Sequence, residues 1–112
     1  MEIDNAVAAL GGIAQPARLE IFRLLVRHGR SGLLAGKIGG ELDLLNATLD
    51  FHLARLRHAG LVSCRRQGHS LIYAANFESM NSLLAYLTEN CCREGGDACA
   101  PGAFERSSAA AG

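Results

Sequence analysis

The sequence has no run of hydrophobic residues long enough to span a membrane, although 49% of its 112 residues are hydrophobic. A transmembrane helix needs about 20 apolar residues in succession. The N-terminus carries the acidic residues Glu2 and Asp4 where a secretory signal peptide would carry basic ones. We therefore predict a cytoplasmic protein. Its length predicts a single small domain that gains buried area by dimerising.

Patterns typical of enzymes are also missing. The sequence has no glycine-rich phosphate loop, no paired acids and no nucleophile with a neighbouring base. We predict that the protein is not an enzyme and that it uses no organic cofactor.

Residues 51–77 contain no Asp or Glu, although the formal net charge of the whole chain is zero. The basic residues of this stretch are Arg55, Arg57, Arg65, Arg66, His52, His58 and His69. A locally basic surface attracts polyanions even where the total charge is zero, so we predict double-stranded DNA as a partner.

Residues 46–59 are predicted to form the helix that reads this DNA. Leu49, Leu53 and Leu56 recur at helical spacing and define one apolar face. Asn46 is expected to cap the helix, and Gly60 is expected to end it in a left-handed conformation. The side chains expected to contact DNA are Asn46, Ala47, Thr48, Phe51, His52, Arg55 and His58. Phe51 is expected to meet a thymine methyl group, or alternatively to tuck under the following hairpin as a core residue.

Three further helices are predicted before it, at residues 3–12, 17–28 and 31–42. The second is apolar around most of its circumference, so it should be the central element of the core. The third contains Gly36, Gly39 and Gly40 and is intrinsically weak. A turn at residues 43–45 joins the third helix to the reading helix, which is the helix-turn-helix pattern.

Residues 61–66 and 69–74 are rich in Val, Ile and Tyr and predict a β-hairpin that turns at Gln67 and Gly68. The basic residues Arg65, Arg66 and His69 are expected to contact DNA phosphates as a wing. The alternative is a hairpin that only covers the core.

Narrow apolar seams at both ends of the chain predict a homodimer. The first seam is Ile3, Val7, Leu10 and Ala14, and the second is Phe77, Met80, Leu84, Leu87 and Cys91. Because the middle of the chain already builds a core, the first and last helices are expected to pack on a second copy, the alternative being packing within one chain. The predicted fold is mainly α with a small β-hairpin, a winged helix-turn-helix over residues 1–93. A tail follows at residues 94–112, flexible beyond residue 101.

Three segments carry a family resemblance. Residues 15–21 read Gln-Pro-Ala-Arg-Leu-Glu-Ile, residues 51–62 read Phe-His-Leu-x-x-Leu-x-x-Ala-Gly-Leu-Val, and residues 65–73 read Arg-Arg-x-Gly-x-x-x-x-Tyr. In this combination the chain resembles the ArsR/SmtB family of bacterial metalloregulators over roughly its first ninety residues. The resemblance implies a dimeric winged-helix repressor of a resistance operon, which leaves its operator when a toxic ion binds.

The chain departs from the best-known pattern of that family at its sensor site. Leu33-Leu34-Ala35-Gly36 stands where many arsenic repressors have Cys-x-Cys, and the last helix lacks the histidines of zinc-sensing relatives. The chain is similar instead to a subgroup whose sensing cysteines follow the last helix. The candidate metal ligands are therefore Cys91, Cys92 and Cys99.

Three clustered thiolates suit As(III) or Sb(III), which bind three in a pyramid, better than Zn²⁺, which needs a fourth ligand. We predict a repressor with As(III) or Sb(III) as inducer. In the alternatives, Cys91 is a small buried hydrophobe, or Cys99 forms a disulfide with Cys91 or Cys92 in a redox-sensing repressor. Cys64, remote in sequence, is expected to be a packing residue. A further alternative is a winged-helix interaction module with a structural metal clip and no operator.

Overall fold

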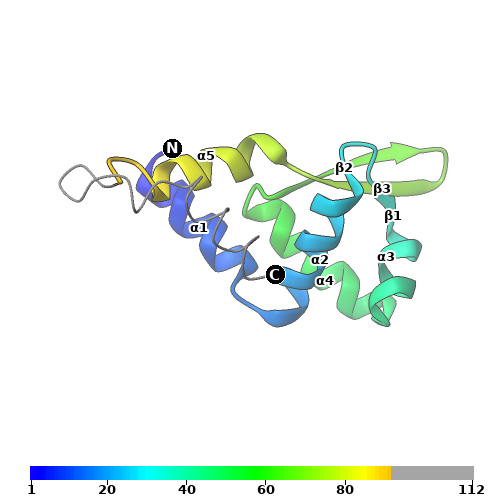
Figure 1. The fold of residues 1–112 in the computed structure, drawn as a ribbon. Coiled ribbons are helices and arrows are strands. Elements are labelled where there is room, and N and C mark those ends of the chain that lie inside the picture. The colour runs from blue at the N-terminus through cyan, green and yellow to red at the C-terminus, as the bar shows by residue number, and fades with distance from the viewer. Residues whose placement is uncertain (92–112) are drawn as a thin grey trace, which may run out of the picture.

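The computed structural model describes residues 1–91 as a helical domain with a small sheet at one side (Figure 1). In chain order the elements are α1 (Ile3–Ile13), α2 (Pro16–His28), β1 (Leu33–Leu34), α3 (Ala35–Leu42), α4 (Asn46–His58), β2 (Val62–Gln67), β3 (Ser70–Ala75) and α5 (Phe77–Leu87). This is the predicted winged helix-turn-helix, with α3 and α4 as the helix pair and β2–β3 as the wing. No helix within residues 1–91 has the length and apolar character needed to cross a bilayer.

The core is built around α2, as its extensive hydrophobic surface predicts. Pro16 begins the helix where its missing amide hydrogen costs nothing, and the Gln15 side chain accepts a hydrogen bond of 3.0 Å from the Arg18 amide. The largest side chains buried in this core are Ile21, Leu25, Ile38, Leu49, Leu53, Leu56 and Leu61. The core therefore joins α2 to the α3–α4 pair and to the start of the wing.

The end of α4 is fixed by the predicted glycine. Gly60 has a φ of 77°, and its amide donates to the Arg57 carbonyl at 2.9 Å, while the Leu61 amide donates to the Leu56 carbonyl at 3.0 Å. These two bonds form a Schellman motif, which satisfies the last carbonyls of the helix. The motif leads α4 directly into β2, so the geometry of the wing is coupled to that of α4.

The start of α4 differs from the prediction. Helical hydrogen bonding begins at the Leu45 carbonyl, which accepts from the Leu49 amide at 2.9 Å. Asn46 is therefore already the first helical residue, and the N-cap position is Leu45, which makes no side-chain cap. The prediction that Asn46 caps α4 is wrong, and its side chain remains exposed at the tip of the helix.

The third helix begins later than predicted because a short strand precedes it. Leu33 and Leu34 form β1, which pairs antiparallel with β3 opposite Tyr73 and Ile72. Gly32, with a φ of 78°, has a left-handed conformation that an α-helix does not use. The sheet order is β1-β3-β2, so β3 is the central strand. The prediction of helix over residues 31–34 is wrong for this reason.

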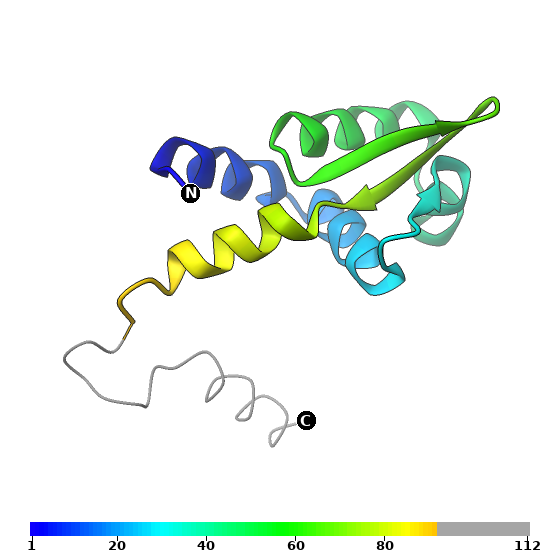
Figure 2. The same cartoon turned by 90° about the horizontal axis from the view of Figure 1, so that it is seen from above.

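The hairpin agrees with the prediction to within one residue at each end. β2 pairs with β3 from Val62 opposite Ala75 to Gln67 opposite Ser70, and Gly68 turns the chain with a φ of 66°. Its tip extends beyond the helices, as Figure 2 shows.

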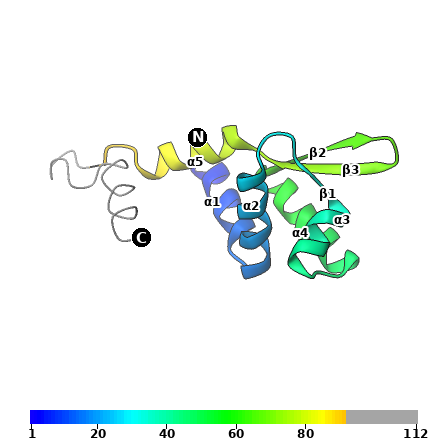
Figure 3. The same cartoon turned by 45° about the vertical axis from the view of Figure 1, so that its right-hand side comes forward.

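The helices α1 and α5 contact each other at the end of the domain opposite the wing tip (Figure 3). Asn76 caps α5 by accepting a hydrogen bond of 3.1 Å from the Ser79 amide. The helix ends at Leu87, because the Thr88 hydroxyl donates to the Leu84 carbonyl at 2.8 Å and Asn90 takes a left-handed φ of 61°. The prediction that the helical seam continues to Cys91 is wrong. Cys92, Cys99 and the predicted tail lie outside the described residues.

Candidate nucleic-acid interface

α4 presents an exposed face opposite its buried leucines. Leu49, Leu53 and Leu56 are at most 2% exposed. The residues that α4 exposes and that were predicted to contact DNA are Asn46, Ala47, Thr48, Phe51, Arg55 and His58. We call the row formed by Thr48, Phe51, Arg55 and His58 the α4 stripe, since these residues recur at helical spacing along one side.

The centre of the α4 stripe is a cation–π pair. The guanidinium carbon of Arg55 lies 5.1 Å from the centroid of the Phe51 ring. Phe51 is 52% exposed, so the alternative that it is a core residue under the hairpin is wrong. The contact limits the rotamers of the arginine and places its five N–H donors beside the face of the aromatic ring.

His52 is the one predicted DNA-contacting residue of α4 that the structure buries. It is 7% exposed and packs edge-on to Phe51, with ring centroids 5.7 Å apart. Burial lowers its pKa, and the positive charge of Arg18 lowers it further, so the ring favours its neutral form. The prediction is wrong because His52 follows Leu49 by three residues and precedes Leu56 by four, which places it on the apolar face.

The wing exposes all three of its predicted basic residues, Arg65, Arg66 and His69. Arg65 donates from Nη2 to the Ser31 carbonyl at 2.7 Å, which ties β2 to the connection between α2 and β1. Arg66 forms no ion pair within residues 1–91. It therefore retains its full donor set for an outside anion, whereas Arg65 is partly engaged.

The described thiols do not form a metal site. Cys91 is exposed in the turn after α5, and Cys64 is half-buried on β2 opposite Tyr73. Burial raises the pKa of Tyr73, and its hydrogen bond with Cys64 raises that pKa further. No group of three potential metal ligands occurs among residues 1–91. The predicted partners Cys92 and Cys99 fall beyond this range, so the metalloid site stays a prediction.

Comparisons with known proteins agree with this geometry. Residues 13–65 match a family described as a helix-turn-helix domain. The HTH-type transcriptional regulator YgaV of Escherichia coli K12 is 30% identical over 89 residues, which cover 80% of this chain and 88% of YgaV. The ArsR-like transcriptional regulator from Rhodococcus sp. RHA1 shares the fold, with a TM-score of 0.69 at 22% identity over 97% of this chain and 91% of that one. The chain belongs to the ArsR family of transcriptional regulators.

HlyU from Vibrio cholerae N16961 is a further structural relative of this ArsR-family regulator. It has a TM-score of 0.63 at 29% identity, covering 82% of this chain and 99% of HlyU, and a structure of reduced HlyU has a TM-score of 0.60. The relatives are transcriptional regulators, which confirms that the regulator is not an enzyme. Membership of the family implies that it binds DNA.

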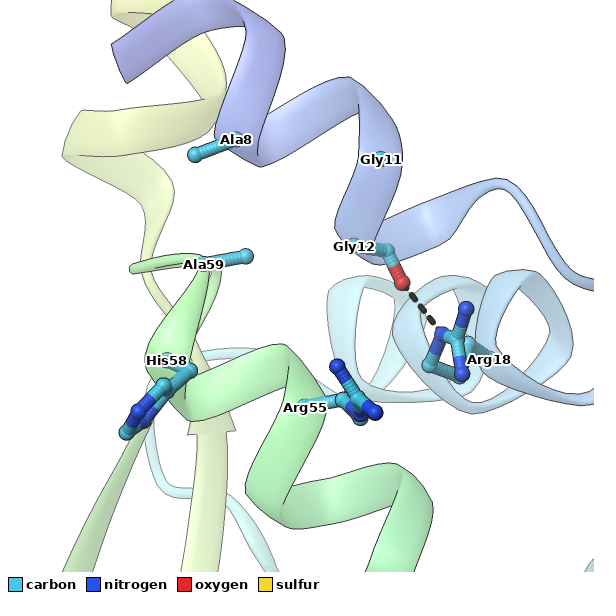
Figure 4. A pocket seen from close by; sticks show the side chains of 7 residues that line it. All are labelled: Ala8, Gly11, Gly12, Arg18, Arg55, His58 and Ala59. Atoms are coloured by element: carbon cyan, nitrogen blue, oxygen red, sulfur yellow. Dashed lines mark hydrogen bonds between the residues drawn. The ribbon is translucent and has the colours of Figure 1, made fainter. Parts of the chain in front are cut away.

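One basic residue near the α4 stripe was not predicted. Arg18 of α2 lies beside Arg55 across a hollow at the junction of α1, α2 and α4 (Figure 4). The only sequence signal was its place in the Gln-Pro-Ala-Arg segment, because the junction itself depends on tertiary packing.

Proposed function

We propose that this ArsR-family regulator is a homodimeric repressor that places one α4 in the major groove of each half of a two-fold operator. The observation that carries the proposal is the exposed α4 stripe beside a basic wing, without an Asp or Glu between residues 51 and 77. A helix with its apolar side in the core and a polar side free is the element that fits the major groove.

Each part of the interface has a distinct chemical role. Asn46, Thr48 and Arg55 carry donors and acceptors suited to base edges, and Phe51 supplies an apolar surface for a thymine methyl group. His58 ends the stripe and is placed to reach bases or phosphates. Arg66 and His69 on the wing suit phosphate contacts, which set register more than sequence.

The roles of base and phosphate contacts are separable by mutation. We expect Arg55→Ala to weaken binding to DNA from the regulator's own upstream region by about 1–3 kcal/mol, with a smaller loss on scrambled DNA. Arg66→Ala, the matched wing variant, should weaken both DNAs by a similar factor. Fluorescence anisotropy on labelled duplexes measures both. Equal losses on the two DNAs for Arg55→Ala would contradict its assignment to bases.

The proposed signal is a trivalent metalloid bound by Cys91, Cys92 and Cys99. Arsenite exchanges its three hydroxyls for three thiolates, and the thiol protons leave with them as three waters. The soft thiolate donors suit As(III) and Sb(III), and the exposed position of Cys91 just after α5 supports an accessible site. Tying the chain at the end of the dimer helix would alter the spacing of the two α4 helices, and a coupling of about 1–3 kcal/mol suffices.

Thiol oxidation is a second candidate for the signal, and the similarity to HlyU favours it. One of the similar HlyU structures is described as reduced HlyU. Two thiols would form one disulfide while hydrogen peroxide accepts their two electrons and two protons and becomes two water molecules. Cys99 with Cys91 or Cys92 is the candidate pair.

Parallel titrations of the reduced regulator on labelled DNA separate the two signals. We expect arsenite and antimonite, but not zinc, to release the DNA, and each of the variants Cys91→Ser, Cys92→Ser and Cys99→Ser to bind DNA without release. Release by peroxide alone, with a disulfide detected by mass spectrometry, would favour oxidation. Retained metalloid response in all three variants would remove these cysteines from the mechanism.

A further inference from the structure

A hollow of about 410 Å³ opens between the end of α1 and the end of α4. Its lining residues are Ala8, Gly11, Gly12, Arg18, Arg55, His58 and Ala59. Figure 4 shows Arg55 extending from α4 toward Arg18, while His58 points away from them at the rim. The hollow therefore has small residues along one wall and two guanidinium groups on the other side.

The small residues at this junction set its shape. A Cβ on Gly12 would lie 2.5 Å from the Ala59 Cβ, so α1 and α4 approach more closely here than any other residue would allow. A Cβ on Gly11 would meet nothing within 4 Å. The wall that α1 gives to the hollow therefore carries no side chain longer than a methyl group at Ala8, Gly11 and Gly12.

Arg18 is held with its donors available. Its Nε donates to the Gly12 carbonyl at 2.6 Å, which fixes the plane of the guanidinium against the end of α1. Neither Arg18 nor Arg55 forms an ion pair with any carboxylate in the described part of the chain. Two neighbouring positive charges without an acid favour an anion beside them, and the Nη groups of Arg18 supply paired donors for its oxygens.

We propose that Arg18 holds a phosphate of the DNA backbone in this hollow, beside Arg55, at the point where α4 leaves the major groove. The inference rests on the proposed function and extends it by assigning Arg18. His58, the last residue of the α4 stripe, follows Thr48 by ten residues, or about 15 Å along a helix, which exceeds the width of about 12 Å of the major groove. If Thr48 reaches bases, the far end of the α4 stripe lies at the bordering phosphates.

The salt dependence of DNA binding tests the contact directly. Each phosphate contact contributes about 0.9 to the slope of log K against log salt concentration, so Arg18→Gln should make the slope of the dimer shallower by about 2. The affinity should fall by the same factor on upstream and scrambled DNA. The matched control is Arg27→Gln, an exposed arginine on the opposite side of α2, nine residues further along, which should leave the slope unchanged.

A conservative variant separates electrostatics from folding. Arg18→Lys keeps the positive charge but cannot reproduce the Nε bond to Gly12 with its guanidinium geometry. We expect it to retain most of the salt slope, with the thermal melt of each variant followed by circular dichroism. If Arg18→Lys and Arg18→Gln reduce the salt slope of DNA binding equally, Arg18 acts only by holding α1 to α2, and the proposal is overturned.

The remaining outcomes distinguish this inference from the proposed function. Absence of DNA binding by the unmodified chain would overturn both. Normal binding with the same slope for Arg18→Gln and Arg27→Gln would overturn the inference alone. Inorganic phosphate is the second probe, with the Gly11 and Gly12 amides followed by NMR. Shifts that require Arg18, combined with an unchanged DNA slope, would assign the hollow to a free oxyanion and contradict the DNA contact.

Discussion

The double substitution Val7→Glu and Leu84→Glu is expected to make the regulator a monomer. It should also lower the affinity for two-fold operator DNA by about 100-fold or more. Two linked α4 helices bind two half-sites with an avidity that neither helix has alone, typically about 10²- to 10⁴-fold. Separating the protomers removes this gain without changing any residue of the DNA-contacting surface. Sedimentation equilibrium and anisotropy on the same samples measure the two effects.

The expectation follows from the apolar surface that α1 and α5 leave exposed. The exposed fractions are 63% for Ile3, 60% for Val7, 41% for Leu10, 53% for Leu84 and 54% for Leu87. These residues belong to the predicted seams, whereas Ala6, Ala9 and Leu83 on the same helices are buried within the protomer. Apolar side chains gathered on two contacting helices are typical of a subunit interface, and a two-fold axis would bury both at once.

The control for oligomeric state is Leu34→Glu. Leu34 is 41% exposed, similar to Leu10, but it lies on β1 at the other end of the domain (Figure 1). We expect this variant to remain a dimer. Because Val7 and Leu84 are already more than half exposed in the protomer, the double variant should still fold. A dimeric double variant would show that the α1–α5 face is not the interface.

Local patterns predicted most of the fold because the relevant interactions are local. The leucines of α4, the apolar circumference of α2 and the left-handed Gly60 each express a helical period or a terminating conformation within a few residues. β1 escaped prediction because it has two residues, and its hydrogen-bonding partner Tyr73 is far along the chain. Leu33 and Leu34 alone fit a helix start as well as a strand.

The residues of the candidate site also fall into those that local patterns predicted and those that depend on tertiary packing. Exposure of the α4 stripe and of the wing arginines followed from periodicity and turn position. His52 was predicted to be exposed because it is polar, whereas its spacing from Leu49 and Leu56 places it on the buried face of α4. Arg18 was missed because its role depends on the packing of α1 against α4 through Gly12 and Ala59, which no short sequence pattern encodes.

Gly32→Ala is expected to lower the free energy of unfolding by about 3–5 kcal/mol, through backbone strain added to a steric overlap. Gly32 has a φ of 78°, and an added Cβ would lie 2.7 Å from the Tyr73 carbonyl oxygen and 2.8 Å from the Ile72 Cγ2. Both neighbours belong to the central strand β3. The Tyr73 carbonyl is part of the backbone and cannot move away without disturbing the β1–β3 pairing. Urea unfolding at one fixed protomer concentration measures the change, since the stability of a dimer depends on concentration.

Two other glycines separate the contributions to this loss. Gly29 also has a positive φ, 98°, but an added Cβ would meet nothing within 4 Å, so Gly29→Ala should cost only the backbone strain, about 1–2 kcal/mol. Gly36 lies in α3 in open space, and Gly36→Ala should stabilise the helix by up to about 1 kcal/mol. Equal losses for Gly32→Ala and Gly29→Ala would mean that β3 yields to the added methyl group.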